Sequence, residues 1–194
     1  MLKVAITGGI GSGKSLVSKV FSLYNIPLYN ADIAAKRIMQ SDAVVIQQLK
    51  LIFGNELYKE GRLDRPFLAS LVFSNSNLLQ QLNAVVHPAI ALDYANWHDR
   101  QNAPYTIKEA AILFESGSDK EIDFVIGVTA PLQLRIQRTM QRDHISETQV
   151  MSRIQNQMDD AQKMALCNAV IHNDNKQSVL LQVALIHNTI IHLT

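Results

Sequence analysis

The chain has 194 residues, of which 47% are hydrophobic and 18% charged, and its formal net charge is +1. This length allows one substantial hydrophobic core, and the composition is not that of a disordered chain. Eighteen basic residues against seventeen acidic ones give no overall field that would hold nucleic acid or an anionic membrane. We therefore expect neither partner, and any anion that the protein binds must be held by local architecture.

The cysteine count and the hydropathy pattern indicate a cytoplasmic protein. Cys167 is the single cysteine, so an intrachain disulfide is excluded, and no Cys/His cluster has the spacing of a zinc site. The apolar run at the N-terminus is too short for a signal peptide, and no stretch approaches the roughly 20 apolar residues of a membrane span. We expect a monomer or a weak homo-oligomer.

The first third of the chain begins with a strand, a glycine-rich turn and a helix. The apolar run Leu2–Ile6 ends at glycines and predicts a buried strand. Apolar residues then recur at helical spacing from Leu16 to Phe21, which predicts a helix. Ile26–Tyr29 is typical of a second strand.

Further strands are predicted beyond residue 100. They are Tyr105–Leu113, Phe124–Thr129 and Ala169–Ile171, followed by an amphipathic helix over Val179–Ile191. Strands that alternate with helices imply a parallel sheet with right-handed crossovers. The predicted fold class is α/β: a three-layer P-loop NTPase fold with a five-stranded parallel sheet.

Two helical insertions interrupt this alternation. The first is rich in Leu, Gln and Ala, and its predicted helices are Ile33–Gln40, Val44–Phe53, Pro66–Phe73 and Leu78–Trp97, the last disturbed at Pro88. The second is also helical and carries most of the arginines of the C-terminal half. We expect one domain with a nucleotide-binding core (1–29, 104–131 and 164–194), a helical substrate-binding insertion (30–103) and a helical lid (132–163).

A phosphate-binding loop is the strongest signal in the chain. The pattern G-x-x-x-x-G-K-[ST] is matched in full by Gly8-Gly9-Ile10-Gly11-Ser12-Gly13-Lys14-Ser15, between a predicted strand and a predicted helix. Glycines allow successive backbone N–H groups to surround a phosphate, and the helix N-terminus faces the same anion. Lys14 supplies a charge for the β- and γ-phosphates, and the Ser15 hydroxyl suits Mg²⁺. The loop predicts binding of a nucleoside triphosphate.

Three classes of P-loop protein compete for this sequence: a GTPase, a motor or DNA-handling ATPase, and a small-molecule kinase. The N-K-x-D element that reads guanine is absent, and so are the basic surface and extra domains of a motor. The best acidic candidate at a strand end is Glu115, after the strand that starts at Tyr105. Small size and two helical insertions, which would cover the acceptor and exclude water, favour the kinase.

Asp32 is the first candidate for the chemistry. It follows the second strand, which we expect to neighbour the first. Ligands bind beyond the carboxyl ends of parallel strands, so its carboxylate is placed near the γ-phosphate to accept a hydroxyl proton. An acid in the first turn of a helix is also favoured by the helix dipole alone. Position leaves both interpretations open.

Arginines form a second pattern. Arg135, Arg138 and Arg142 recur at i, i+3 and i+7, so one helical face carries all three. Such a stripe is either a solvated basic face or a lid that neutralises the transferring phosphoryl group. Arg153 and Gln157 lie on a following helix that is able to face the same cleft. His87 is either a buried hydrogen-bonded residue or a ligand-binding one.

These motifs together resemble the dephospho-coenzyme A kinase family from Val4 to about Asn173. The segments that carry the resemblance are Ile6–Ser15, Asn30–Lys36, Gly61–Arg65 with Val72-Phe73, His87-Pro88, Ile112–Glu115, Gln137–Asp143, Arg153–Met158 and Val170–Asn173. Asn30 departs from the family pattern D-A-D by replacing its first Asp, which leaves the acid/base role to Asp32 alone.

The resemblance implies transfer of the ATP γ-phosphoryl group to the ribose 3′-hydroxyl of dephospho-CoA, with Mg²⁺. Asp32, Lys14, Arg138 and Arg142 would be catalytic, Ser15 would bind the metal, and Asp32, Arg65, His87 and Glu115 would bind the acceptor. The nucleotide-binding set is Gly9, Gly11, Ser12, Gly13, Lys14, Ser15 and Leu16. The rival functions are another small-molecule kinase, such as a nucleoside monophosphate kinase, and a non-catalytic nucleotide-binding module.

Overall fold

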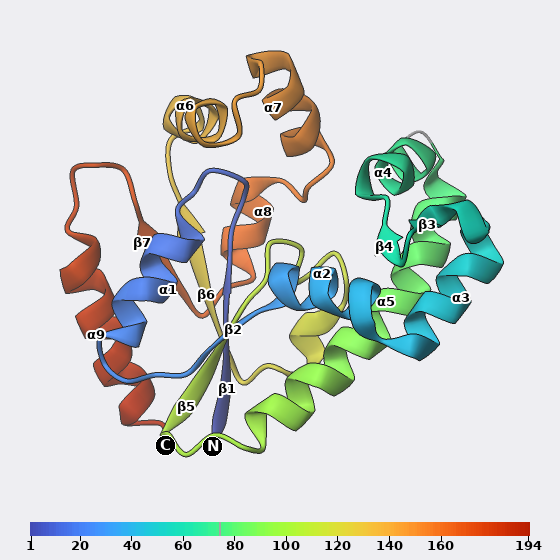
Figure 1. The fold of residues 1–194 in the computed structure, drawn as a ribbon. Coiled ribbons are helices and arrows are strands. Elements are labelled where there is room, and N and C mark those ends of the chain that lie inside the picture. Colours follow the sequence, from blue (N-terminus) through green and yellow to red (C-terminus); the bar gives the residue numbers. More distant parts are fainter. Residues whose placement is uncertain (74) are drawn as a thin grey trace. The chain divides into compact units, whose positions relative to one another are not determined.

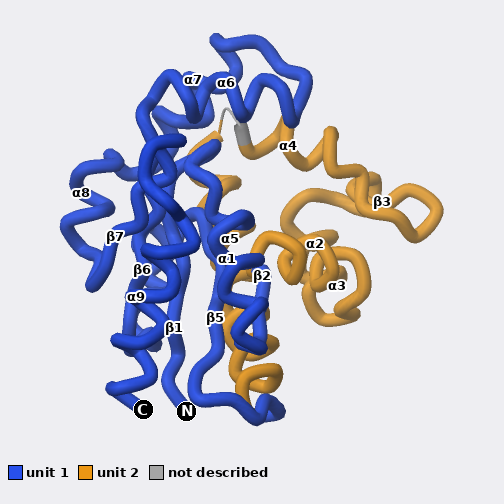
Figure 2. Tube along the Cα trace, turned by 90° about the vertical axis from the view of Figure 1, so that its left-hand side faces the viewer, with its two compact units in different colours: residues 1–30, 100–194 blue, residues 31–99 orange. Residues whose placement is uncertain are grey.

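The computed structural model describes residues 1–73 and 75–194 (Figure 1). Contacts divide the chain into two compact units, which Figure 2 colours separately. Unit 1 comprises residues 1–30 and 100–194, and unit 2 comprises residues 31–99. The long insertion between the second and third large strands is therefore a compact body of its own.

Unit 1 is built on a parallel sheet. Its strands are β1 (Leu2–Thr7), β2 (Leu28–Asn30), β5 (Tyr105–Glu109), β6 (Phe124–Thr129) and β7 (Ala169–His172). They lie in the order β2-β5-β1-β6-β7, and every neighbouring pair is parallel. The expectation that the second strand neighbours the first is wrong, because β5 lies between β2 and β1. The predicted five-stranded parallel sheet is confirmed. The helices of unit 1 are α1 (Lys14–Ser22), η2 (Ser118–Glu121), α6 (Leu132–Asp143), α7 (Glu147–Gln155), α8 (Asp160–Ala165) and α9 (Val179–Ile191).

Alternating residues of β6 show why unit 1 has three layers. Ile126 and Val128 are fully buried in one core with residues of α1 and α9. Gly127 lies between them and faces the other side of the sheet, where a side chain at its position would meet Met164 of α8. Successive residues of a strand point to opposite faces, so helices cover the sheet on both sides.

The structure corrects the predicted end of β5. The strand was expected to reach Leu113, but it ends at Glu109, and residues 111–117 form turns. The Ala110 N–H still donates to the Ile6 carbonyl at 3.0 Å, after which the chain leaves the sheet. Leu113 is fully buried in this turn. Apolar residues therefore continue beyond the last residue of the strand, and the sequence pattern does not mark where the strand ends.

Unit 2 is helical with one small hairpin. Its elements are α2 (Ala31–Ser41), α3 (Ala43–Phe53), η1 (Asn55–Leu57), β3 (Tyr58–Lys59), β4 (Arg62–Leu63), α4 (Arg65–Phe73) and α5 (Ser76–His98). Asp42 begins α3 by accepting hydrogen bonds from the N–H groups of Val44 and Val45. Pro88 lies inside α5 without interrupting it, so the predicted disturbance does not divide this helix.

The hairpin of unit 2 was missed by the sequence analysis. β3 and β4 contain two residues each, and the residues between them, Glu60 and Gly61, both have positive φ. Two positive φ values in a two-residue connection are typical of a tight hairpin turn. Strands this short leave no alternation of apolar and polar residues to detect.

The core of unit 2 provides a test of its folding. Leu49 is fully buried, whereas Leu51, two residues later on α3, is 81% exposed. Leu49→Ala should lower the free energy of unfolding by about 2–5 kcal/mol, because it leaves a cavity. Leu51→Ala, the matched control, should change it by less than about 0.5 kcal/mol. Chemical denaturation followed by circular dichroism measures both, and equal losses would contradict the assigned packing.

Candidate active site

The glycine-rich loop joins β1 to α1, and glycine is required at two of its positions. Gly11 and Gly13 have φ of +75° and +96°, in the left-handed region. A side chain at Gly11 would overlap the Arg135 carbonyl, and one at Gly13 would overlap the Asn173 amide. Asn173 also donates from Nδ2 to the Ser12 carbonyl at 2.8 Å. The loop is therefore closely packed by residues from α6 and from the end of β7.

A cavity of about 240 Å³ lies at this loop. It is lined by Gly11, Gly13, Lys14, Ser15, Arg138 and Arg142. Lys14 Nζ donates to the carbonyls of Gly8 at 2.9 Å and Gly9 at 3.3 Å. The structure thus brings together the loop lysine, the loop serine and two of the three arginines expected on the lid.

The two cavity arginines are oriented by different partners. Arg138 donates from Nη1 to the Asn173 carbonyl at 3.0 Å and from Nη2 to Asn175 Oδ1 at 2.7 Å. Arg142 forms a two-pronged ion pair with Asp143, from Nε at 2.7 Å and from Nη2 at 3.0 Å. The pKa of Asp143 is lowered, chiefly by its hydrogen bonds from the Arg142 guanidinium. Asp143 also forms an ion pair with Arg153.

Arg135 does not share the role expected of the arginine stripe, because its side chain is only 6% exposed. It donates from Nε to the Ile10 carbonyl at 3.0 Å, and Nη1 lies 3.1 Å from Asp160 Oδ1. The N–H of the same Ile10 donates to Gln157 Oε1 at 2.9 Å. Arg135 and Gln157 therefore hold the loop rather than face a cleft, and Arg153 pairs with Asp143.

Glu115 lies in a second polar cluster of unit 1. Its Oε1 accepts from Lys163 Nζ at 2.7 Å and from the Met158 N–H at 2.9 Å. Lys163 is fully buried and also donates to the Ala111 carbonyl at 3.0 Å. Burial alone raises the pKa of Glu115, but these hydrogen bonds outweigh it and hold the pKa below its usual value. The second oxygen of Glu115 takes part in neither contact.

Glu109 is a site residue that the sequence analysis missed. It is the last residue of β5, and its Oε1 accepts a hydrogen bond of 2.7 Å from the Ser15 hydroxyl. Because the strand was predicted to end at Leu113, the acid expected at its end was Glu115 rather than Glu109. The sequence signal that could have identified Glu109 is an acid at the carboxyl end of a strand that neighbours the loop strand.

The remaining predicted residues belong to unit 2. Asp32 is exposed in the first turn of α2, directly after the strand β2 ends at Asn30. Arg65 is exposed at the start of α4, and His87 is half-buried in α5.

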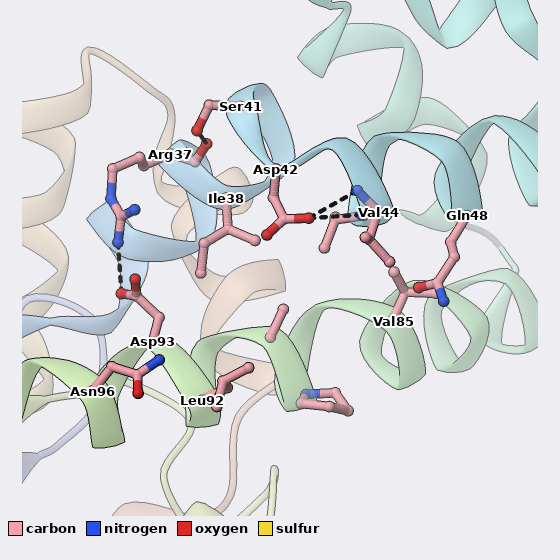
Figure 3. Close-up of a pocket in the computed structure, with 13 residues that line it drawn as sticks. Arg37, Ile38, Ser41, Asp42, Val44, Gln48, Val85, Leu92, Asp93 and Asn96 are labelled. Atoms are coloured by element: carbon pink, nitrogen blue, oxygen red, sulfur yellow. Dashed lines mark hydrogen bonds and ion pairs between the residues drawn. The ribbon is translucent and has the colours of Figure 1, made fainter.

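A groove of about 540 Å³ runs between the α2–α3 pair and α5 within unit 2 (Figure 3). Its walls include Ile38, Val85 and Leu92, and the ion pair between Arg37 and Asp93 lies at its edge.

Within residues 1–73 and 75–194, no group of three or more His, Cys, Asp or Glu side chains is arranged to hold a metal ion. The described helices include none that is long and apolar enough to cross a membrane.

Comparisons with known proteins agree along almost the whole chain. A family model for dephospho-CoA kinase matches residues 2–178. A dephospho-CoA kinase of Bacteroides fragilis is 36% identical over 183 residues, which are 94% of this chain and 89% of that protein. One from Porphyromonas gingivalis is 40% identical over 157 residues, covering 81% of this chain and 78% of that protein.

Solved structures show the same similarity. A Thermus thermophilus protein is 33% identical with a TM-score of 0.86, over 100% of this chain and 98% of its own. A dephospho-CoA kinase from Campylobacter jejuni is 26% identical with a TM-score of 0.70, over 98% and 97%. A shikimate kinase from Acinetobacter baumannii shares the fold at 13% identity with a TM-score of 0.54, over 100% and 95%.

Two glycines with nearly equal φ separate backbone strain from loop packing. Gly61 has φ of +76°, like Gly11, but a side chain there meets nothing within 4 Å. Gly61→Ala should cost about 1–2 kcal/mol of stability and keep nucleotide binding. Gly11→Ala should also displace the Arg135 carbonyl and lose about tenfold or more in ATP affinity, measured by calorimetry. Equal ATP affinities in both variants would contradict the assigned packing.

The Glu115–Lys163 pair predicts a pH-dependent stability. Because the folded-state pKa of Glu115 is lowered, its contribution is complete above the unfolded value of about 4.3 and is lost as the pH falls through the folded pKa. Glu115→Gln leaves the buried Lys163 charge without a counter-ion, so stability at neutral pH should fall by roughly 3–5 kcal/mol.

Denaturation measured across the acid range checks this prediction. The curve of Glu115→Gln should be flatter in acid than that of the unchanged protein, and adding Lys163→Met should recover much of the loss at neutral pH. A Glu115→Gln protein with the original acid slope would show that the pair does not form.

Proposed function

The chain belongs to the dephospho-CoA kinase family, and we propose that the site at the glycine-rich loop performs this reaction with the residue roles given below. The enzyme is a transferase that moves the γ-phosphoryl group of ATP to the ribose 3′-hydroxyl of dephospho-CoA, giving coenzyme A and ADP. The observation that carries these roles is the cavity where Lys14 and Ser15 meet Arg138 and Arg142. The comparisons give no support to a nucleoside monophosphate kinase.

The loop and the arginines provide for a polyphosphate. Backbone N–H groups at the N-terminus of α1 and the Lys14 ammonium bind the β- and γ-phosphates of ATP. Arg138 and Arg142 line the same cavity and neutralise the charge that spreads over the transferring phosphoryl oxygens. Contacts within the chain orient both guanidinium groups, Arg138 through the Asn173 carbonyl and Arg142 through Asp143.

Asp32 acts as the base that prepares the acceptor. Its place directly after β2 supports this role, since ligands of parallel sheets bind beyond the carboxyl ends of the strands. The Asp32 carboxylate accepts the proton of the 3′-hydroxyl as that oxygen bonds to the γ-phosphorus. The bond from this phosphorus to the bridging oxygen breaks, and ADP leaves with the electron pair.

The loop fits a magnesium ion bound through oxygen. The Ser15 hydroxyl lines the cavity and a carboxylate lies beside it, which is the hard donor chemistry that Mg²⁺ prefers. Magnesium usually keeps few protein ligands and completes its coordination with substrate phosphates and water. When bound, the ion would supply positive charge to the β- and γ-phosphates.

The helical parts take the remaining roles. Unit 2 would bind dephospho-CoA, with Arg65 and His87 on the acceptor side, and residues 132–163 would form the lid over ATP. Glu115 joins the acceptor side through the carboxylate oxygen that Lys163 and Met158 leave unused. A cytoplasmic location and a monomeric or weakly oligomeric state stay predictions from the sequence.

Asp32→Asn tests the proposed base directly. In a coupled assay, the unchanged protein should release ADP with dephospho-CoA and not with adenosine, AMP or simple sugars. The asparagine variant cannot accept the hydroxyl proton, so kcat should fall by about 10²- to 10⁴-fold while ATP still binds.

The control is Glu121→Gln, because Glu121 is an exposed acid in the first turn of η2, outside the lid and outside unit 2. The substitution removes one negative charge from a helix start without touching the reaction. Its turnover should equal that of the unchanged protein. An Asp32→Asn protein that turned over at the original rate would remove Asp32 from the mechanism.

A further inference from the structure

We propose that Arg135 and Asp160 are positioning residues for ATP, because their ion pair fixes the first turn of α6 against the glycine-rich loop and so sets where the two cavity arginines lie. The proposal rests on the proposed ATP-dependent function. Arg135 lies in the first turn of α6, and Asp160 is the first residue of α8. The pair therefore joins the two ends of the segment that carries Arg138 and Arg142. Neither residue belongs to the motif of the loop.

Arg135 contacts three successive residues of the loop. Its Nε donates to the Ile10 carbonyl at 3.0 Å. A side chain at Gly9 would overlap the Arg135 guanidinium, and one at Gly11 would overlap the Arg135 carbonyl. Both glycines thus leave room for this one residue, and its side chain and backbone together define the path of the loop from Gly9 to Gly11.

Asp160 holds the Arg135 guanidinium in place. Its Oδ1 lies 3.1 Å from Arg135 Nη1, and its Oδ2 accepts from the Thr129 hydroxyl at 2.5 Å. Thr129 is the last residue of β6, so the carboxylate connects the guanidinium to the carboxyl end of the sheet. A guanidinium that is only 6% exposed requires a counter-charge, because its desolvation is costly. Among the described residues Oδ1 has no hydrogen-bond donor, so the Arg135 charge compensates its burial in turn.

The fixed turn determines the position of the cavity arginines. Arg138 and Arg142 follow Arg135 by about one and two turns of α6. An α-helix rises by about 5.4 Å per turn, so fixing its first turn fixes the distance of both arginines from the loop. At the other end of the segment, Gln157 Oε1 accepts from the Ile10 N–H at 2.9 Å. Loosening the ion pair should therefore weaken ATP binding through the loop and phosphoryl transfer through the arginines.

The experiment removes the counter-charge. Asp160→Asn keeps an oxygen that accepts from the Thr129 hydroxyl, but it leaves the Arg135 guanidinium without a charged partner. The Ile10 carbonyl then loses a fixed donor, so the Kd for ATP should rise by about tenfold or more, measured by calorimetry. The kcat with dephospho-CoA should fall by a similar factor, because Arg138 and Arg142 are no longer held at one distance from the loop.

The matched control is the neighbouring acid. Asp159 is exposed and caps α8 by accepting from the Gln162 N–H at 3.1 Å. Asn caps helices as well as Asp, so Asp159→Asn makes the same change of charge one residue away without losing the cap. Its Kd for ATP and its kcat should equal those of the unchanged protein.

A double variant separates positioning from a general structural role. Replacing a buried ion pair by apolar residues of similar volume often preserves stability. The midpoint of thermal unfolding, lowered in Asp160→Asn, should therefore return toward the original value in Arg135→Met/Asp160→Leu. Its ATP affinity should stay low, because neither new side chain donates to the Ile10 carbonyl. Hydrogen exchange of residues 8–13 without ATP should be faster in both variants and unchanged in Asp159→Asn.

The outcomes distinguish this proposal from the function on which it rests. An Asp160→Asn protein with the original Kd for ATP would overturn the proposal, and so would a double variant whose ATP affinity returned together with its stability. If the unchanged protein bound no ATP, the proposed function itself would fail. Hydrogen exchange would then still test the ion pair, since loop exchange at the original rate in Asp160→Asn would show that the pair does not hold the loop.

Discussion

The site depends on one loop residue, Ile10, whose backbone N–H and C=O are both held by side chains. The N–H of Ile10 donates to Gln157, and its carbonyl accepts from the buried Arg135. Arg135 is paired in turn with Asp160, which Thr129 at the end of β6 also contacts. Three segments that are distant in the chain thus set the path of the glycine-rich loop. A loop with several glycines has high conformational entropy, and these contacts reduce the number of conformations from which it must bind a phosphate.

Elements with a local cause were predictable from the sequence. The buried strand before the glycines, the helix after them and the helices of the insertion each follow from apolar spacing and turn residues within a short window. The parallel sheet followed less directly, through the rule that alternating strands and helices wind such a sheet, but its strand order did not, because β5 lies between β2 and β1. Local patterns also identified four cavity residues. The loop motif contains Lys14 and Ser15, and helical spacing groups Arg138 with Arg142. The structure brings all four to one cavity.

Features that arise from packing between distant segments were not predictable. Helical spacing groups Arg135 with its two neighbours, but only the fold shows that Arg135 turns into the protein toward Ile10 while the other two face the cavity. The end of β5 was misplaced for the same reason, since Leu113 is as apolar in a buried turn as in a strand. Glu109 then went unrecognised, because its partner Ser15 is set by sheet register rather than by sequence distance.

The two cavity arginines are not equivalent, although the helical repeat presents them as a pair. The partners of Arg138 are a carbonyl and an amide oxygen, which orient the guanidinium without compensating its charge. Arg142 shares its charge with the Asp143 carboxylate. A phosphoryl group in the cavity therefore meets the full charge of Arg138 but competes with Asp143 for Arg142. The chain has almost no net charge, yet it forms a site for an anion. It does so because Arg138 is held by neutral oxygen atoms, while a carboxylate, that of Asp143, pairs with Arg142 instead.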